Sequence, residues 1–147
     1  MESETPNEQN IGLKVENNIL QLGMLMIFLW DSLGAVASRM LEFDYTNIGA
    51  GTILIYLAAG FITARKKSVK KAVKYTAIMG LFESTVCWVI VIMLEPNTVG
   101  KSYQPYSVVL WIFVVIAVIC TTALIGLIGA GIAMATKRKI PVMENFS

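Results

Sequence analysis

The stretch VVLWIFVVIAVICTTALIGLIGAGIAMA, residues 108–135, carries no charged side chain. A helix that crosses a lipid bilayer needs about 20 mainly apolar residues, with a range of roughly 17–25. Residues 108–135 therefore predict a membrane-spanning helix that is long enough to tilt, or to extend past the hydrocarbon layer by a turn or more. This stretch decides the fold class, because such a run is typical of membrane helices.

Three further apolar runs precede this one, at residues 19–37, 48–64 and 75–94. Each has the length of a membrane helix, so the sequence predicts an all-α, polytopic membrane protein built as a four-helix bundle. The transmembrane domain extends over residues 19–136 in this prediction. Residues 1–18 are polar and acidic, and we expect a flexible cytoplasmic tail there that becomes helical toward Ile11–Val15. Residues 137–147 form a basic cytoplasmic tail.

The composition is also typical of a membrane protein, since 56% of the residues are hydrophobic and 15% are charged. An ordinary soluble domain has about 25% charged residues. The chain has no histidine, and its two cysteines, Cys87 and Cys120, lie inside apolar runs. A zinc site or a disulfide framework needs more ligands at defined spacings. We therefore expect no metal and no cofactor, and we interpret both cysteines as small apolar residues.

The basic residues predict the orientation. With four spans, the two terminal segments and the segment between the second and third spans share one side, which holds ten of the twelve Lys and Arg residues. The cytoplasmic side is the one enriched in these residues, so both termini are predicted to lie in the cytoplasm of a bacterium, beneath its inner membrane. The middle segment is expected to be a basic loop that contains Arg65, Lys66, Lys67, Lys70, Lys71 and Lys74. Contact with anionic headgroups is favoured for this loop over docking of an acidic partner or of nucleic acid.

Two carboxyl groups interrupt the apolar runs, Asp31 in the first and Glu83 in the third. Insertion scales give about 2.5–3.5 kcal/mol for aspartate at the centre of a membrane helix, so both side chains are expected to face the bundle interior. From the expected span starts, Asp31 lies roughly 18 Å deep and Glu83 roughly 12 Å deep. Three interpretations stay open: a neutral carboxyl that only hydrogen-bonds, a carboxylate that exchanges a proton or binds a cation, and a polar contact with a partner helix.

Helical spacing places these carboxyls among small and polar residues. Thr76, Gly80, Glu83 and Cys87 recur at intervals of three and four, so they are predicted to share one face of the third span. Thr52, Tyr56, Gly60 and Thr63 line up in the same way on the second span. Small residues allow helix backbones to approach closely, and the candidate packing positions are Gly34, Gly60, Gly126 and Ala130.

Two segments carry a resemblance to other proteins. In AAGFITARKK, residues 58–67, a helix with small residues ends in a basic cluster, and AIMGLFESTVCW, residues 77–88, opens the second hairpin. Over the middle third of the chain, the protein resembles uncharacterised small four-helix membrane proteins of bacteria. This resemblance implies the four-helix topology and no particular activity.

The sequence favours a non-enzymatic membrane component, either an accessory subunit or a protein that associates with itself through its small-residue faces. Short outer loops and the lack of a soluble domain leave little space for an enzyme site. The alternative is a small proton- or cation-coupled transporter that uses Glu83, with Asp31 assisting. The expected partners are the lipid bilayer and either further copies of the chain or another membrane protein. No nucleic acid is expected.

Overall fold

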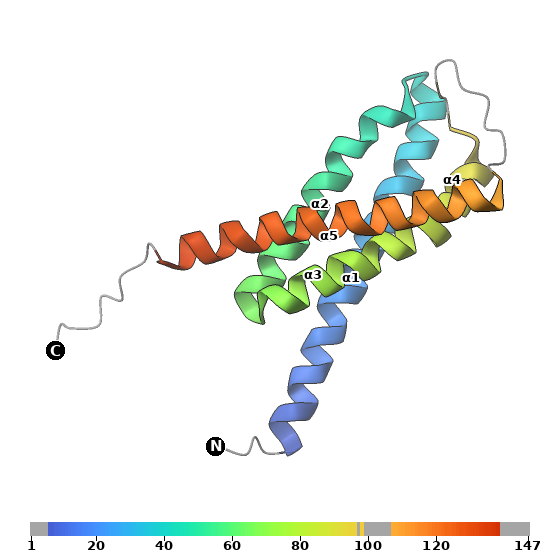
Figure 1. Ribbon diagram of the computed structural model, residues 1–147. Helices are drawn as coiled ribbons and strands as arrows, with labels where there is room; N and C mark the ends of the chain where they lie inside the picture. The colour runs from blue at the N-terminus through green and yellow to red at the C-terminus, as the bar shows by residue number, and fades with distance from the viewer. Residues whose placement is uncertain (1–5, 97, 99–106, 139–147) are drawn as a thin grey trace.

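The computed structural model describes residues 6–96, 98 and 107–138, and the side chains of residues 18–136 within these ranges. The described residues form helices and turns without a β-strand, so the predicted all-α class is confirmed. The elements, in chain order, are α1 (Pro6–Leu41), the 3₁₀ turn η1 (Tyr45–Ile48), α2 (Gly49–Lys66), α3 (Val69–Phe82), the π-helical turn η2 (Glu83–Cys87), α4 (Trp88–Leu94) and α5 (Val108–Arg138) (Figure 1). The segments α3, η2 and α4 follow one another without a break and form one long helix.

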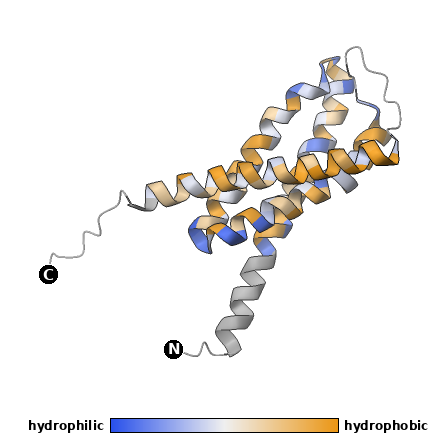
Figure 2. Cartoon of the chain, viewed as in Figure 1, coloured by the Kyte–Doolittle hydropathy of each residue, from blue (hydrophilic) through white to orange (hydrophobic). Residues whose placement is uncertain are grey.

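Four helices are long and apolar enough to cross a membrane, as the sequence predicts. Their apolar segments are Asn18–Leu41, Tyr45–Lys66, Val69–Leu94 and Val108–Thr136, and each contains one of the expected spans. The helix α5 is the most apolar, with hydrophobic residues along its whole length (Figure 2). Its 31 residues extend about 46 Å, which exceeds the hydrocarbon thickness of about 30 Å. A helix of this length is longer than a perpendicular crossing of the hydrocarbon layer requires.

The first helix begins earlier than the sequence analysis expects. It starts at Pro6, inside the segment 1–18 that is expected to be a flexible tail. Proline favours the first position of a helix, because its fixed φ suits the helix and its missing N–H would be unpaired there in any case. No further proline interrupts α1, so the helix continues directly into the apolar segment.

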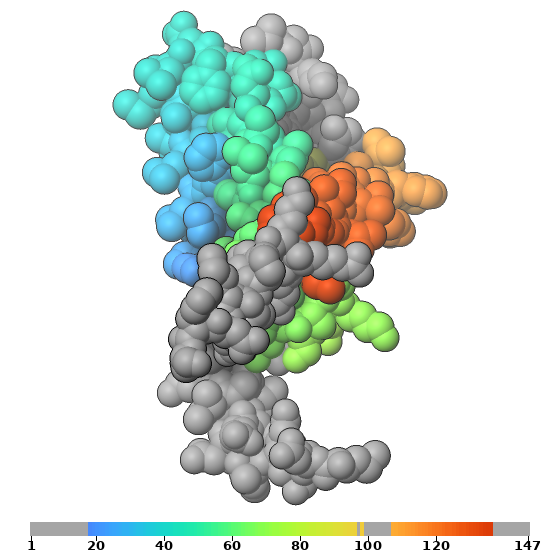
Figure 3. Space-filling model, turned by 90° about the vertical axis from the view of Figure 1, so that its left-hand side faces the viewer, coloured from blue at the N-terminus to red at the C-terminus, as the bar shows by residue number. Residues whose placement is uncertain are grey.

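The helices form two antiparallel hairpins that cross obliquely. One hairpin consists of α1 and α2, and the other pairs α5 with the long helix of α3, η2 and α4 (Figure 1). Among the described residues, α5 packs on α2, α3 and η2, whereas α1 contacts every other helix except α5. Figures 1 and 3 accordingly place α1 and α5 on opposite sides of the molecule. The centre of the fold is thus formed by α2 and the long third helix.

Glycines set the closest contact between α2 and α5. A Cβ atom on Gly60 would lie 2.5 Å from the backbone oxygen of Gly126, and one on Gly129 would collide with the backbone oxygen of Leu57. No side chain therefore fits between the two backbones at this crossing. Van der Waals contact between main chains holds it together, as is common where membrane helices meet through small residues.

The basic segment between α2 and α3 is a tight corner and not the expected loop. The helix α2 ends at Lys66 and α3 begins three residues later, so only Lys67 among the six basic residues lies between the two helices. Arg65 and Lys66 occupy the last turn of α2, where positive charge interacts favourably with the helix dipole. Ser68 caps α3 by accepting a hydrogen bond from the backbone N–H of Lys71 at 3.3 Å. Because of this cap, α3 begins directly after the corner. The other three basic residues therefore lie in the first turns of α3.

Candidate functional site

A π-helical turn at Glu83–Cys87 interrupts the long third helix. The backbone N–H of Trp88 bonds to the oxygen of Glu83, five residues earlier, as such a turn requires. The hydroxyls of Thr85 and Ser84 both donate to the oxygen of Leu81, at 2.6 Å and 3.2 Å, and so stabilise the chain where the turn begins. Single π turns inside α-helices are rare and are frequently found at functional sites.

The π turn changes the directions in which its side chains point. A regular α-helix would put Glu83 and Cys87 on one face, as the sequence analysis expects. In the structure, Glu83 faces α2 and α5, whereas Cys87 bonds to Asp31 on α1. A π turn has more residues per turn than an α-helix, so Cys87 is rotated about the helix axis relative to its α-helical position, and one short segment serves two neighbouring helices.

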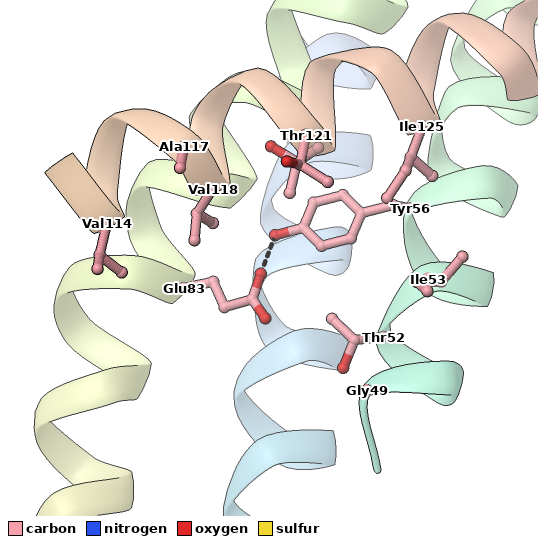
Figure 4. Close-up of a pocket in the computed structure, with 11 residues that line it drawn as sticks. Gly49, Thr52, Ile53, Tyr56, Glu83, Val114, Ala117, Val118, Thr121 and Ile125 are labelled. Carbon is pink, nitrogen blue, oxygen red and sulfur yellow. Dashed lines mark hydrogen bonds between the residues drawn. The ribbon is translucent and has the colours of Figure 1, made fainter. Parts of the chain in front are cut away.

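Tyr56 of α2 holds the carboxyl group of Glu83. Its hydroxyl donates a hydrogen bond to Glu83 Oε2 at 2.6 Å (Figure 4). The tyrosine is only 1% exposed, and the glutamate is half-buried. Buried polar groups need such partners, and a phenol satisfies a carboxyl group without bringing in a positive charge.

Asp31 of α1 is buried beside the same turn. It is 5% exposed, makes a side-chain hydrogen bond with the Cys87 thiol, and lies close enough to Glu83 for their charges to interact. Asp31 is thirteen residues beyond Asn18, and Glu83 is fourteen beyond Val69, so each lies about 20 Å along its apolar segment. The two carboxyls therefore share one depth, because α3 begins earlier than the expected span of residues 75–94.

No Lys or Arg side chain bonds to either carboxyl in the part of the chain that the structure describes. The basic residue nearest to Asp31 along α1 is Arg39, and it donates to the backbone oxygen of Leu94 at 3.4 Å. Two buried negative charges repel each other and lose their hydration. This arrangement favours a pair that holds a proton or a cation. We call Asp31, Tyr56, Glu83 and Cys87 the carboxyl cluster, and it is the candidate site.

A pocket of about 350 Å³ lies next to Glu83, between α2 and α5. Thr52 and Tyr56 line it from α2, Thr121 and Thr122 line it from α5, and the other lining residues are aliphatic or glycine (Figure 4). Glu83 is the one ionisable carboxyl among the lining residues. Sites for small molecules typically have volumes of about 300–1,000 Å³ and are mostly apolar with a few polar groups, so the pocket has the form of a ligand site.

The other members of the predicted polar face, Thr76 and Gly80, belong to helix packing. Thr76 is fully buried, and its hydroxyl donates to the backbone oxygen of Ala72 at 3.1 Å. A Cβ atom on Gly80 would collide with Thr122 of α5, and Thr76 in turn occupies the space beside Gly126. These residues close the interface between α3 and α5 and do not line the pocket, apart from Thr122.

The predicted packing residues have different surroundings. Gly60 and Gly126 meet at the crossing of α2 and α5, and Ala130 is completely buried in a cluster of alanines. Gly34 of α1 lies against the side chain of Ile48, the residue directly before α2, so this contact lies where η1 leads into α2. The six basic residues of the predicted loop all lie at the corner between α2 and α3.

The sequence analysis did not identify Tyr56 as the partner of Glu83. Helical periodicity puts Tyr56 and Thr52 on one face of the second span, but it does not pair Tyr56 with a residue 27 positions away. The available signal was the phenol itself, because a tyrosine hydroxyl inside an apolar helix needs a hydrogen-bond partner. The π turn left no signal in the α-helical spacing. Thr121 was missed as well, since it lies off the stripe of small residues on the fourth span.

The chain matches no known protein family, no curated protein and no solved structure. The resemblance to small four-helix bacterial membrane proteins therefore rests on its two segments alone. The function has to be inferred from the carboxyl cluster and the pocket.

Proposed function

We propose that the protein is a multi-pass component of the bacterial cytoplasmic membrane with both termini in the cytoplasm. The four apolar helices support this proposal. The basic corner, the start of α1 and the end of α5 lie toward one end of the molecule, as four alternating crossings require (Figure 1). An excess of Lys and Arg marks the cytoplasmic side of membrane proteins.

Within the membrane we propose a non-enzymatic role as a small carrier that couples transport to a proton or cation at Glu83. The observation that carries this proposal is the 2.6 Å hydrogen bond between Tyr56 and Glu83 at the wall of a 350 Å³ pocket. A carboxyl group with a purely structural role needs hydrogen-bond partners but no adjoining space. An ionisable residue inside a membrane domain that also faces a cavity is typical of an ion or substrate pathway.

Glu83 has two usable states in this setting. When it is ionised, Oε2 accepts the hydrogen bond from Tyr56, and the second oxygen is available to a cation in the pocket. When it is protonated, the neutral carboxyl still accepts the same bond through its carbonyl oxygen. Tyr56 thus holds the side chain in place while the charge is exchanged. Asp31 adds negative potential behind Glu83, which favours the binding of a cation.

The pocket lies toward the end of the molecule that is opposite the basic corner. Its walls come from residues 49–56 of α2 and residues 114–125 of α5. Beyond them, toward the corner, Gly60 and Gly126 bring the two backbones into contact. In the proposed topology, a ligand enters from the outer side while the cytoplasmic side is closed. Release to the cytoplasm then requires α2 and α5 to separate at this glycine contact, as alternating access demands.

The carrier function predicts cation-driven proton exchange in liposomes. Purified protein is reconstituted with a pH-sensitive dye inside, a pH gradient is imposed, and Na⁺, K⁺ or butyltrimethylammonium is added outside. We expect at least one of these cations to collapse the gradient with the wild-type protein. Glu83→Gln should abolish the exchange, because an amide neither takes up a proton nor attracts a cation.

The matched control is Glu95→Gln, which removes an exposed carboxylate at the end of α4. This variant should retain the exchange, with at most a modest loss of rate from one surface charge fewer, whereas Glu83→Gln should show none. Both variants have to insert into the membrane and elute as folded protein. Normal exchange by folded Glu83→Gln would contradict the assignment of Glu83 as the exchange site.

A second candidate function is an accessory or self-associating membrane component, and the exposed surface of α5 favours it. Only 6% of the apolar window of α5 is buried inside the molecule, so most of this helix is available to lipid or to another helix. We expect native mass spectrometry after gentle solubilisation from the native membrane to separate the two functions. A stoichiometric second protein would identify an accessory subunit. A monomer or homo-oligomer that retains Glu83-dependent exchange would support the carrier.

A further inference from the structure

We infer that the pocket beside Glu83 binds an organic ammonium ion with a small apolar body. This ligand class rests on the proposed carrier function and specifies which cation Glu83 exchanges. It follows from three properties of the pocket and its surroundings: the charge at its wall, its size and lining, and the acidic end of the molecule toward which it lies.

The charge of the lining selects a monovalent cation. Glu83 contributes one carboxylate, and one of its oxygens already accepts the hydrogen bond from Tyr56. Figure 4 shows this carboxyl group directed into the space bounded by Tyr56, Thr52 and α5. A hard divalent ion such as Ca²⁺ takes six to eight oxygen ligands, and the described residues contain no group of three Asp, Glu, Cys or His side chains arranged to hold a metal. One negative charge instead balances one ammonium group.

The size and the lining select an organic ion. A water molecule occupies about 30 Å³, so a pocket of about 350 Å³ greatly exceeds the space that a bare monovalent ion fills. Aliphatic side chains, among them Ile53, Val118 and Ile125, make up much of the wall. Such a wall gains free energy by removing hydrocarbon from water. A ligand with its positive group at Glu83 and a short hydrocarbon chain along this wall satisfies both parts of the pocket.

Tyr56 fixes the carboxyl group at the wall of the pocket. Its hydroxyl points to Glu83 and donates a hydrogen bond at 2.6 Å, while the side chain as a whole is only 1% exposed. The second oxygen of the carboxylate is thereby held in one position for a cation, and a neutral ligand of the same shape gains nothing from this charge.

The end of the molecule toward which the pocket lies is acidic. Glu42 and Glu95 are exposed there at the ends of α1 and α4, and Asp44 caps η1 by accepting a hydrogen bond from the backbone N–H of Thr46. Arg39 is the one basic residue that the structure describes at this end. A net negative surface beside a cleft raises the local concentration of cations and speeds their entry.

The test is calorimetric titration of the full-length protein in lipid nanodiscs with butyltrimethylammonium, whose charge does not change with pH. Tetramethylammonium has the charge without the hydrocarbon chain, and 3,3-dimethyl-1-butanol has a similar branched body without the charge. We expect butyltrimethylammonium to bind at least tenfold more tightly than tetramethylammonium. The neutral alcohol should give no saturable binding.

Three variants locate the binding. Glu83→Gln should weaken binding of butyltrimethylammonium at least tenfold because it removes the charge. Ala117→Phe should weaken it as strongly, because a bulky side chain on α5 fills the pocket without changing the carboxyl cluster. The matched control, Ala135→Phe, alters an exposed position of the same helix outside the pocket and should bind as the wild-type protein does.

Equal binding of the neutral alcohol, or undiminished binding by folded Glu83→Gln, overturns the ligand class and identifies an apolar site, such as one for a lipid acyl chain. If Glu83→Gln does not fold, the three ligands on wild-type protein decide the question. The carrier function is tested separately, by the exchange measurement in liposomes. Glu83-dependent exchange of Na⁺ or K⁺ without binding of butyltrimethylammonium supports the carrier and contradicts the ligand class. Glu83-dependent binding of butyltrimethylammonium without any exchange in liposomes supports the ligand class and contradicts the carrier.

Discussion

Glu83 and Tyr56 form the contact on which the proposed site depends. The tyrosine hydroxyl is buried and bonds to the carboxyl group at 2.6 Å, so each side chain satisfies the other in an apolar setting. The cost of losing one partner exceeds the value of the bond itself, because the remaining polar group stays buried without a hydrogen bond. Stability measurements on this pair therefore report whether the contact exists in the folded protein.

A double-mutant cycle on Glu83→Leu and Tyr56→Phe checks this contact. Glu83→Leu should lower the free energy of unfolding by about 1–3 kcal/mol, because it leaves the phenol unpaired. The two substitutions together should cost about 1–3 kcal/mol less than the sum of the single effects. The measurement is denaturant-induced unfolding in detergent micelles.

The control for this cycle is Glu83→Gln, which keeps an oxygen for Tyr56 and should change the free energy of unfolding little. The stability and exchange measurements then separate the two roles of Glu83. Additive effects of the Leu and Phe substitutions would show that the two side chains do not touch in the folded protein.

The crossing of α2 and α5 is the element whose geometry determines access to the pocket. Gly60 and Gly126 place the two backbones in contact on the side toward the basic corner, and the helices diverge around the pocket on the other side. A side chain at Gly60 must push the helices apart, because the neighbouring atoms belong to the backbone of Gly126 and cannot rotate away. The contact therefore both stabilises the fold and closes one end of the pocket.

Gly60→Ala is expected to lower the free energy of unfolding by about 1–3 kcal/mol through overpacking. The matched control is Gly131→Ala on α5, because a Cβ atom there meets no atom within 4 Å. This control should be neutral or more stable by up to about 1 kcal/mol, since alanine is the better helix former. Thermal unfolding of both variants in the same detergent measures the difference. Equal stability of the two variants would contradict the close approach of α2 and α5.

The whole molecule has a strongly asymmetric charge distribution. The basic corner lies at one end, and exposed acidic residues lie at the other. In the proposed topology this asymmetry orients the chain, because basic segments tend to be retained on the cytoplasmic side of a membrane. The same topology would place the pocket toward the outer leaflet, so the orientation of the molecule decides from which side a cation enters.

Cysteine labelling in intact cells checks this orientation. We expect Asn47→Cys, in η1, to react with a charged, membrane-impermeant maleimide added outside. Ser68→Cys, at the basic corner, should react only after the cells are opened. The wild-type chain is the control, since Cys87 is buried and Cys120 lies in the middle of the apolar segment of α5. The opposite labelling pattern would reverse the proposed topology.

The amino-acid sequence by itself determined the all-α class and the four apolar helices, because hydrophobic length and composition are properties of each segment alone. Helical spacing also identified the inward stripe of α2 that contains Thr52, Tyr56 and Gly60. Spacing placed Gly126 and Ala130 on the buried side of α5 in the same way. These features need no knowledge of the neighbouring helices, since a 3.6-residue period defines a face locally.

Only the tertiary structure decided how the carboxyl groups are paired. Tyr56 meets Glu83 and Cys87 meets Asp31 because two hairpins cross obliquely and a π turn rotates one side chain relative to the other. The tight basic corner and the early start of α1 also differ from the sequence expectation, because caps and helix starts depend on a few local atoms that hydropathy does not register. The rotation and crossing of helices arise from contacts between distant segments, and the spacing within one helix does not encode them.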